Sequence, residues 1–165
     1  MLAMVVLASA APAASRTDVI RILDSCLTGT FHDMYAASPA ARRLVDRLER
    51  SDLVLHVVSK PFDRRPFTGT MTFVVRAGGR RFLRIAIDAR LPPDRRAAAL
   101  AHELQHALEV ADDTTVVDHA SFATLYRRIG HESGGDSAAN CFETVAALRT
   151  GARVLAEFRA ATSGR

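Results

Sequence analysis

A chain of 165 residues is long enough for one folded domain and too short for two of ordinary size. Apolar residues make up 48% and charged residues 24% of the chain, a balance that excludes disordered and fibrous proteins. The net charge is +4, but the arginines occur as scattered pairs without a nucleic-acid-binding motif, so we expect no nucleic-acid partner.

The first 14 residues form a short apolar stretch that ends in small side chains, as a secretory signal peptide does. Ala11-Pro12-Ala13 offers a cleavage site, although a positively charged start is missing. The stretch is shorter than the roughly 20 apolar residues that span a bilayer, so we expect no stable membrane anchor. The alternative is that residues 1–14 begin an ordinary helix. The expectation is a secreted or periplasmic bacterial protein with one domain over residues 15–165.

The segment after this leader has apolar residues at helical spacing, which predicts a first helix over residues 17–27. Ser38-Pro39 is typical of a helix start, with serine as the N-cap and proline in the first turn. It predicts a second helix that ends near residue 50.

The pattern then changes to one typical of strands. Residues 53–58 are rich in β-branched side chains and predict a strand. Residues 70–76 and 80–89 alternate between two faces, and Gly78-Gly79 lies between them. Two alternating runs joined by paired glycines predict a β-hairpin.

Three helices are predicted in the remaining chain. The first covers residues 95–111, and the second covers 119–129 and stops at a glycine. Residues 132–137 are typical of a loop, and the last helix is expected from about 137 to 161. Gly151 in its middle indicates a kink or a close approach to another helix. Two helices, three strands and three helices predict an α+β domain.

The predicted helix over 95–111 contains the sequence His102-Glu103-Leu104-Gln105-His106, which fits the HExxH motif. Residues four apart lie on one face of a helix, so His102 and His106 can bind the same metal ion. Glu103 lies beside them, where it can act as the base that activates water. A catalytic zinc site needs a third protein ligand and one open position.

Uncharged residues flank the motif over residues 99–108, and here the chain resembles the zincin metallopeptidases. The resemblance implies Zn2+ as the cofactor, a peptide or protein as the substrate, and peptide hydrolysis as the reaction. It also implies a zincin-like fold, in which a small sheet precedes the HExxH helix and its edge strand binds substrate in extended form. The strand over 80–89 is the nearest candidate for that edge. The alternative function is a zinc-binding module of the same fold that binds or senses without catalysis.

The third ligand separates the zincin groups. The metzincin pattern requires glycine where this chain has Glu109, so Asp112, the ligand position of that pattern, is disfavoured. In gluzincins a glutamate on a later helix is the ligand, and the resemblance assigns this role to Glu143. The alternative is that Glu143 merely stabilises a helix N-terminus. The rival ligands that stay open are Asp118, His119, Glu132 and Asp136.

Gluzincins also use a histidine or tyrosine to stabilise the oxyanion of the reaction, and Tyr126 and His131 are the nearest candidates. The alternative is that Tyr126 packs its ring at the edge of the core and that His131 is a loop residue. An aspartate is expected to hold the second nitrogen of a ligand imidazole. The candidates for this are Asp112, Asp113 and Asp118.

Two cysteines, Cys26 and Cys141, are consistent with a single disulfide in an exported protein. Two buried thiols are the alternative, because the sequence does not give the distance between the two Cα atoms. We expect the protein to be a monomer.

Overall fold

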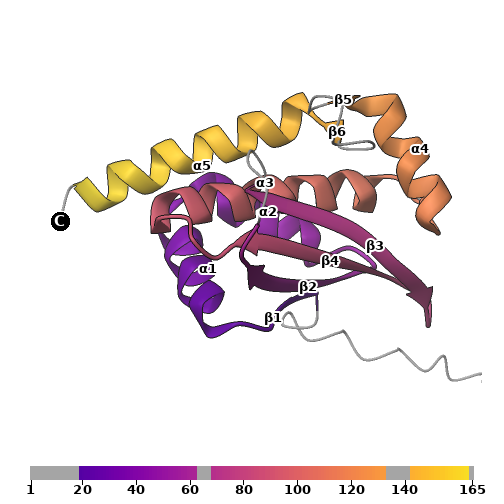
Figure 1. Ribbon diagram of the computed structural model, residues 1–165, viewed down its shortest axis with the longest axis horizontal. Helices are drawn as coiled ribbons and strands as arrows, with labels where there is room; N and C mark the ends of the chain where they lie inside the picture. The colour runs from indigo at the N-terminus through magenta and orange to yellow at the C-terminus, as the bar shows by residue number, and fades with distance from the viewer. Residues whose placement is uncertain (1–18, 63–67, 133–141, 164–165) are drawn as a thin grey trace, which may run out of the picture.

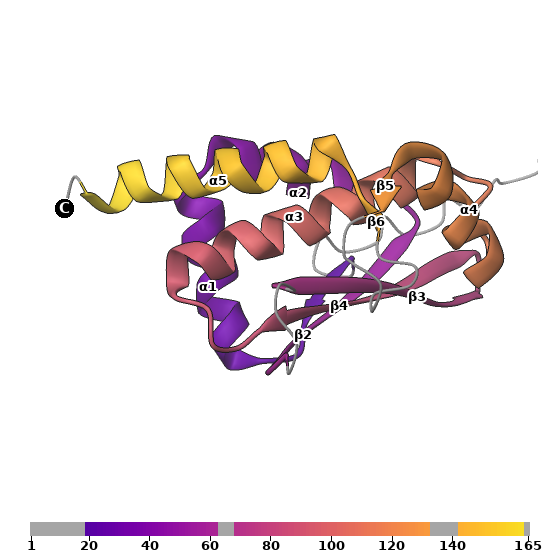
Figure 2. The same cartoon turned by 45° about the horizontal axis from the view of Figure 1, so that its top comes forward.

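A four-stranded mixed sheet forms one layer of the computed structural model, and helices cover one of its faces (Figures 1 and 2). The structure describes residues 19–62, 68–132 and 142–163. Helix α3 (Pro93–Asp112) crosses the sheet, and α5 (Val145–Ser163) lies on the side of α3 away from the sheet. The fold is therefore α+β, as predicted.

Two more helices, α1 (Ser25–Ala37) and α2 (Pro39–Leu48), pack beside α3, and α4 (His119–Ile129) lies near one end of the sheet. The second helix begins as predicted, since the Ser38 hydroxyl accepts a hydrogen bond of 3.0 Å from the Ala41 amide. None of the five helices among the described residues is long and apolar enough to cross a membrane.

The strands of the sheet are arranged in the order β1-β2-β4-β3. Strands β1 (Ile20–Ile22), β2 (Leu53–Lys60) and β4 (Arg80–Asp88) run parallel, and β3 (Gly69–Ala77) is antiparallel to β4. The predicted hairpin is confirmed, and both of its turn glycines have positive φ angles of 56° and 76°. The expectation that residues 80–89 form the edge was wrong. Strand β4 pairs on both sides, which leaves β3 outermost.

The helix predicted over residues 17–27 was also wrong. Ile20–Ile22 forms strand β1, which pairs with β2 and places Ile20 opposite Leu55. Helix α1 begins after Asp24, whose carboxylate accepts a hydrogen bond of 2.8 Å from the Cys26 amide. A short apolar run is compatible with a helix or with a strand. Here the edge of β2 is available for pairing, so Ile20–Ile22 forms a strand.

The last helix starts later than predicted. Phe142–Glu143 forms strand β6, which pairs antiparallel with β5 (His131–Glu132), and α5 begins only at Val145. Glu143 therefore lies on a strand and not in a helix. Helices α3 and α4 match their predicted ranges closely. Most of the predicted loop after residue 132 lies outside the described residues.

Two other predictions also concern residues outside the described part of the chain. The predicted signal peptide covers residues 1–14, so secretion stays a prediction. Cys141 is not described either, so its disulfide with Cys26 stays a prediction. Cys26 itself is exposed, which contradicts the alternative of two buried thiols.

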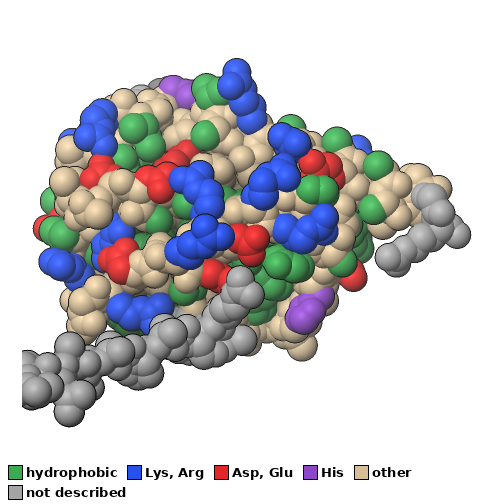
Figure 3. All heavy atoms as spheres, turned by 180° about the vertical axis from the view of Figure 1, so that it is seen from behind, with side chains coloured by type: hydrophobic (Ala, Val, Ile, Leu, Met, Phe, Trp, Pro, Cys, Tyr) green, Lys and Arg blue, Asp and Glu red, His purple; other side chains and the backbone are tan. Residues whose placement is uncertain are grey.

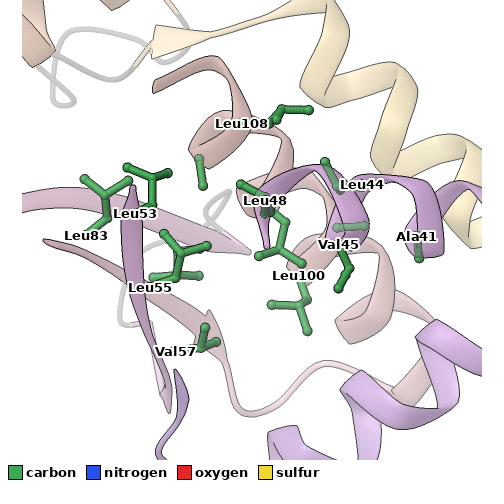
Figure 4. Close-up of a cluster of buried hydrophobic side chains, with 14 of the residues drawn as sticks. Ala41, Leu44, Val45, Leu48, Leu53, Leu55, Val57, Leu83, Leu100 and Leu108 are labelled. Atoms are coloured by element: carbon green, nitrogen blue, oxygen red, sulfur yellow. The ribbon is translucent and has the colours of Figure 1, made fainter. Parts of the chain in front are cut away.

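The core lies where the sheet meets α2 and α3, and branched aliphatic side chains fill it (Figure 4). Leu48 from α2, Leu55 from β2, Leu83 from β4 and Leu100 from α3 have no exposed surface. Each such side chain contributes about 1.5–3 kcal/mol by leaving water. These contacts hold the helix that carries His102 and His106 against the sheet.

A buried arginine fixes the C-terminal end of α3. The Arg81 side chain is only 2% exposed and donates hydrogen bonds of 2.8 and 2.6 Å to the Asp52 carboxylate. It also donates bonds of 2.7 Å to the carbonyl of Val110, in the last turn of α3, and to the carbonyl of Asp113, the C-cap residue of that helix. Arg81 thus joins strand β4 to the end of α3, the helix that carries His102 and His106.

We expect Asp52→Asn to destabilise the fold at neutral pH by about 1–3 kcal/mol, because it weakens hydrogen bonds to a buried charge. The hydrogen bond from Arg81 lowers the pKa of Asp52 below its usual 3.8. Asp52 therefore stabilises the fold fully above that pH, and the stabilisation is lost as the pH falls through the lowered pKa. Urea unfolding from pH 7 to pH 2 should show the two proteins converging in acid. The exposed Asp33→Asn variant is the control, and a gap that persists at low pH would contradict the assignment.

Candidate metal centre

His102 and His106 from α3 and Glu143 from β6 bring their side chains to one point. One ligand atom from each lies within 4.8 Å of the others. The two imidazoles lie one helical turn apart on the same face of α3, with ring centroids 4.8 Å apart. Among residues 19–62, 68–132 and 142–163, this is the only such group of three. It could hold a metal ion.

The distances within the group fit a shared ion. The Oε1 atom of Glu143 lies 3.1 Å from Nε2 of His102 and 3.3 Å from Nε2 of His106. Ligands about 2.0–2.1 Å from a tetrahedral ion lie about 3.3–3.4 Å from one another. The two distances to Glu143 therefore match those between ligands of one ion, and the ligand atoms of all three side chains lie within 4.8 Å of one another.

The position of Glu143 depends on how closely α5 approaches α3. A Cβ atom on Gly151 would lie 3.3 Å from both the Ala98 carbonyl oxygen and the His102 Cβ. Without that side chain, α5 packs directly against the histidine-bearing helix, as the sequence indicated. The β5–β6 pair precedes α5 and holds Glu143 opposite His131.

Glu109 contacts His106 through Nδ1, the ring nitrogen that does not face Glu143. Its Oε2 atom lies 2.9 Å from Nδ1 of His106, and its Oε1 atom accepts a hydrogen bond of 2.6 Å from the Thr144 hydroxyl. A carboxylate on Nδ1 leaves Nε2 facing the ion. The Thr144 hydroxyl also accepts a bond of 3.1 Å from the Ala147 amide, near the start of α5. The Thr144 hydroxyl thus links Glu109, which orients the His106 imidazole, to the start of α5.

The expectation that Asp112, Asp113 or Asp118 could hold the second nitrogen of an imidazole was wrong for His106, where Glu109 does so. Asp112 forms an ion pair of 2.9 Å with Arg47, and Asp113 forms one of 2.5 Å with Arg128. Asp118 caps α4. Glu109 lies three residues after His106 on the same helix, a spacing that brings side chains together and could have identified it.

The two histidines favour the deprotonated form of the Glu143 carboxylate. Burial opposes ionisation, but hydrogen bonds from His102 and His106 hold the pKa of Glu143 far below its usual range. Burial favours neutral His106, but hydrogen bonds to Glu109 and Glu143 outweigh it and raise the pKa of His106 to about 9. A metal ion must therefore compete with a proton at His106.

Glu103 lies beside the two histidines and is 6% exposed. Burial raises its pKa to about 7, against the opposing charges of His106 and His102. Its carboxylate packs against the first residue of strand β3, because a Cβ atom on Gly69 would lie 2.6 Å from Oε1 of Glu103. The edge strand and the glutamate of the motif are therefore in direct contact.

Tyr126 and His131 lie on two sides of the group. The Tyr126 hydroxyl donates a hydrogen bond of 2.9 Å to the His106 carbonyl, and its buried ring packs edge-on against the His106 imidazole. This is the packing role that the alternative described. His131 is exposed, and its place opposite Glu143 puts both side chains on one face of the β5–β6 pair. An oxyanion role for either residue stays a prediction.

The rival third ligands lie elsewhere where the structure describes them. Asp112 and Asp118 are engaged as an ion-pair partner and a helix cap. His119 is exposed and packs against Phe73, with ring centroids 5.7 Å apart. The side chains of Glu132 and Asp136 lie outside the described part of the chain.

Comparisons with protein-family models, curated proteins and solved structures find no match to this chain. Its function is therefore inferred from the side chains of the centre and their surroundings.

If Glu143 is a metal ligand, its replacement with alanine should lower affinity for Zn2+ as the probe ion by more than about 100-fold, since loss of a direct ligand exceeds the 10–100-fold effect of outer partners. Asp112→Ala also removes a carboxylate and should leave the affinity unchanged. Competition with a chromogenic chelator measures both variants. The reverse ranking would place the third ligand in α3.

Thr144→Val should weaken zinc binding by about tenfold, because it frees Glu109 from its hydrogen bond. It should also cost about 1 kcal/mol of stability, because the start of α5 loses its cap. Ser38→Ala removes a comparable cap from α2, away from the centre, and separates the two effects. Equal zinc affinity in all three proteins would show that Thr144 serves only as a cap.

Proposed function

We propose that this protein is a zinc-dependent peptide hydrolase with His102, His106 and Glu143 as its metal ligands. The observation that supports it most is the convergence of these three side chains beside the buried carboxylate of Glu103. Glu109 already supports His106, so Glu103 is a second buried carboxylate beside the proposed ligands, in the position that a general base requires.

Zinc fits the donor set better than the other common ions. Two imidazole nitrogens and one carboxylate oxygen match the ligands of catalytic zinc sites, which keep a fourth position open. Calcium and magnesium prefer six or more oxygen ligands, and histidine is a poor choice for either. The support that Glu109 gives to His106 is typical of zinc ligands.

A zinc ion held by His102, His106 and Glu143 would supply Lewis acidity for a carbonyl and for water near neutral pH. Glu103 then acts as the general base, taking a proton from the attacking water and later giving it to the departing amine. Its buried position keeps the carboxylate poorly solvated and thus reactive toward that proton. Because Gly69 has no side chain, it leaves room for the Glu103 carboxylate.

The edge strand β3 is the proposed docking site for the peptide. One side of β3 pairs with β4, and no strand among the described residues pairs with the other side. An extended peptide can add to such an edge through main-chain hydrogen bonds. Because β3 begins at Gly69, next to Glu103, a peptide bound along it would run toward the general base.

The arrangement supports a relation to the zincins but departs from the expected pattern in one respect. A small mixed sheet that precedes the HExxH helix is what the resemblance implies, and here the sheet has four strands with β3 at its edge. The proposed third ligand, however, lies on the short strand β6 instead of in a helix. The protein would then be a compact variant of the gluzincin arrangement.

Glu103→Gln is the most direct test of catalysis. We expect it to retain one equivalent of zinc and to reduce peptide cleavage by at least about 100-fold, the usual contribution of a general base. Gly69→Ala should also reduce cleavage, because its Cβ would displace the Glu103 carboxylate. Gly29→Ala is the matched control, since a Cβ there meets nothing within 4 Å.

Cleavage can be followed by mass spectrometry on a peptide library, with zinc content and circular dichroism measured on the same samples. If Glu103→Gln retains zinc and cleaves as fast as the unaltered protein, the catalytic role of Glu103 is wrong. If the unaltered zinc-loaded protein cleaves nothing in the library, the alternative of a zinc-binding module for binding or sensing is favoured.

A further inference from the structure

A groove of about 340 Å³ lies between α2, α3 and α5, away from the three proposed metal ligands. Four arginines line it, two from α2 and two from α5: Arg43, Arg47, Arg149 and Arg153. Gln105 of α3 and Thr150 of α5 also line the groove.

The four arginines are arranged in two facing rows. Within each helix the two residues are four positions apart and therefore lie one turn apart on the same face. Like charges at this spacing repel each other, and the second row adds to that repulsion. All four side chains are exposed, so the guanidinium groups can reach a ligand. This repulsion between the arginines lowers the stability of the fold. An anion bound in the groove would offset the repulsion.

Nearby carboxylates balance only part of this charge. Arg47 donates bonds of 3.1 and 2.9 Å to Asp112, and Arg153 donates one of 3.0 Å to Glu157. Arg43 and Arg149 form no ion pair within the described part of the chain. The four arginines and two carboxylates thus leave a local charge of +2.

The other residues that line the groove provide polar contacts and an apolar surface. The Thr150 hydroxyl donates a hydrogen bond of 3.1 Å to Oε1 of Gln105, which leaves the Gln105 amide nitrogen as a further donor. Leu44 and Leu108 form the apolar part of the lining. Apolar surface beside a guanidinium group strengthens its bonds to an anion by excluding water.

Figure 3 shows the face of the molecule behind the view of Figure 1. Lys and Arg side chains gather over the middle of that face, with Asp and Glu side chains among them. Basic side chains are thus common on the surface, and positive charge alone does not single out a site. The groove differs because its arginines come from two facing helices and share one concave lining.

We propose that this groove binds a phosphoryl group, either as free phosphate or as the monoester of a larger molecule. A phosphate monoester carries about −1.5 to −2 charges at neutral pH, which matches the local charge of the groove. The planar forks of arginine fit phosphate oxygens in pairs, and the volume is that of a small-ligand site. The proposal does not depend on the metal centre or on catalysis.

The test is a calorimetric titration at constant ionic strength with inorganic phosphate and, separately, with O-phosphoserine. The variant Arg43→Gln/Arg149→Gln removes the two arginines without carboxylate partners. Arg84→Gln/Arg127→Gln is the matched control, because it removes the same charge from exposed positions outside the groove. Thermal melting checks that both variants fold.

We expect saturable binding to the unaltered protein, at least about tenfold weaker in the groove variant and unchanged in the control. Binding of inorganic phosphate would identify the free ion as sufficient, and binding of O-phosphoserine alone would indicate a monoester. Absence of saturable binding by both would overturn the proposal. An equal loss in both variants would also overturn it, because the effect would then be that of net charge.

Discussion

Helix α5 lies so close to α3 that a Cβ atom on Gly151 would come within 3.3 Å of that helix. At Gly151 the α5 backbone approaches both the Ala98 carbonyl and the His102 side chain. This contact sets where α5 begins, and the segment before it carries Glu143 to the two imidazoles. Thr144 then joins the start of α5 to Glu109, which orients His106. The positions of Glu143 and the two histidines therefore depend on how α5 packs against α3.

Features that depend on neighbouring residues could be predicted from the sequence. The spacing of His102 and His106 follows from the helical period, and the glycine pair at residues 78 and 79 specifies the hairpin turn. Serine followed by proline at residue 38 identified the start of α2. In each case the determining contacts span at most a few residues, so tertiary packing had little to add.

Features that depend on distant partners could not be predicted in this way. Ile20–Ile22 becomes a strand because β2 offers an open edge, and Phe142–Glu143 becomes one because β5 pairs with it. The role of Glu109 depends on Thr144, 35 residues later in the chain. Glu143 itself was anticipated through the zincin resemblance, and its position on a strand was not. The conformation of such short segments depends on the strands with which they pair.

The buried Arg81 has a consequence for how the centre relates to folding. It holds the carbonyls at the end of α3 to strand β4, and the aliphatic core holds the rest of that helix to the sheet. Neither contact involves His102, His106 or Glu143. In zinc fingers, by contrast, metal binding and folding are a single event. The contacts that hold α3 to the sheet do not require an ion, so a metal bound by these side chains would meet groups already ordered, with little conformational entropy left to lose.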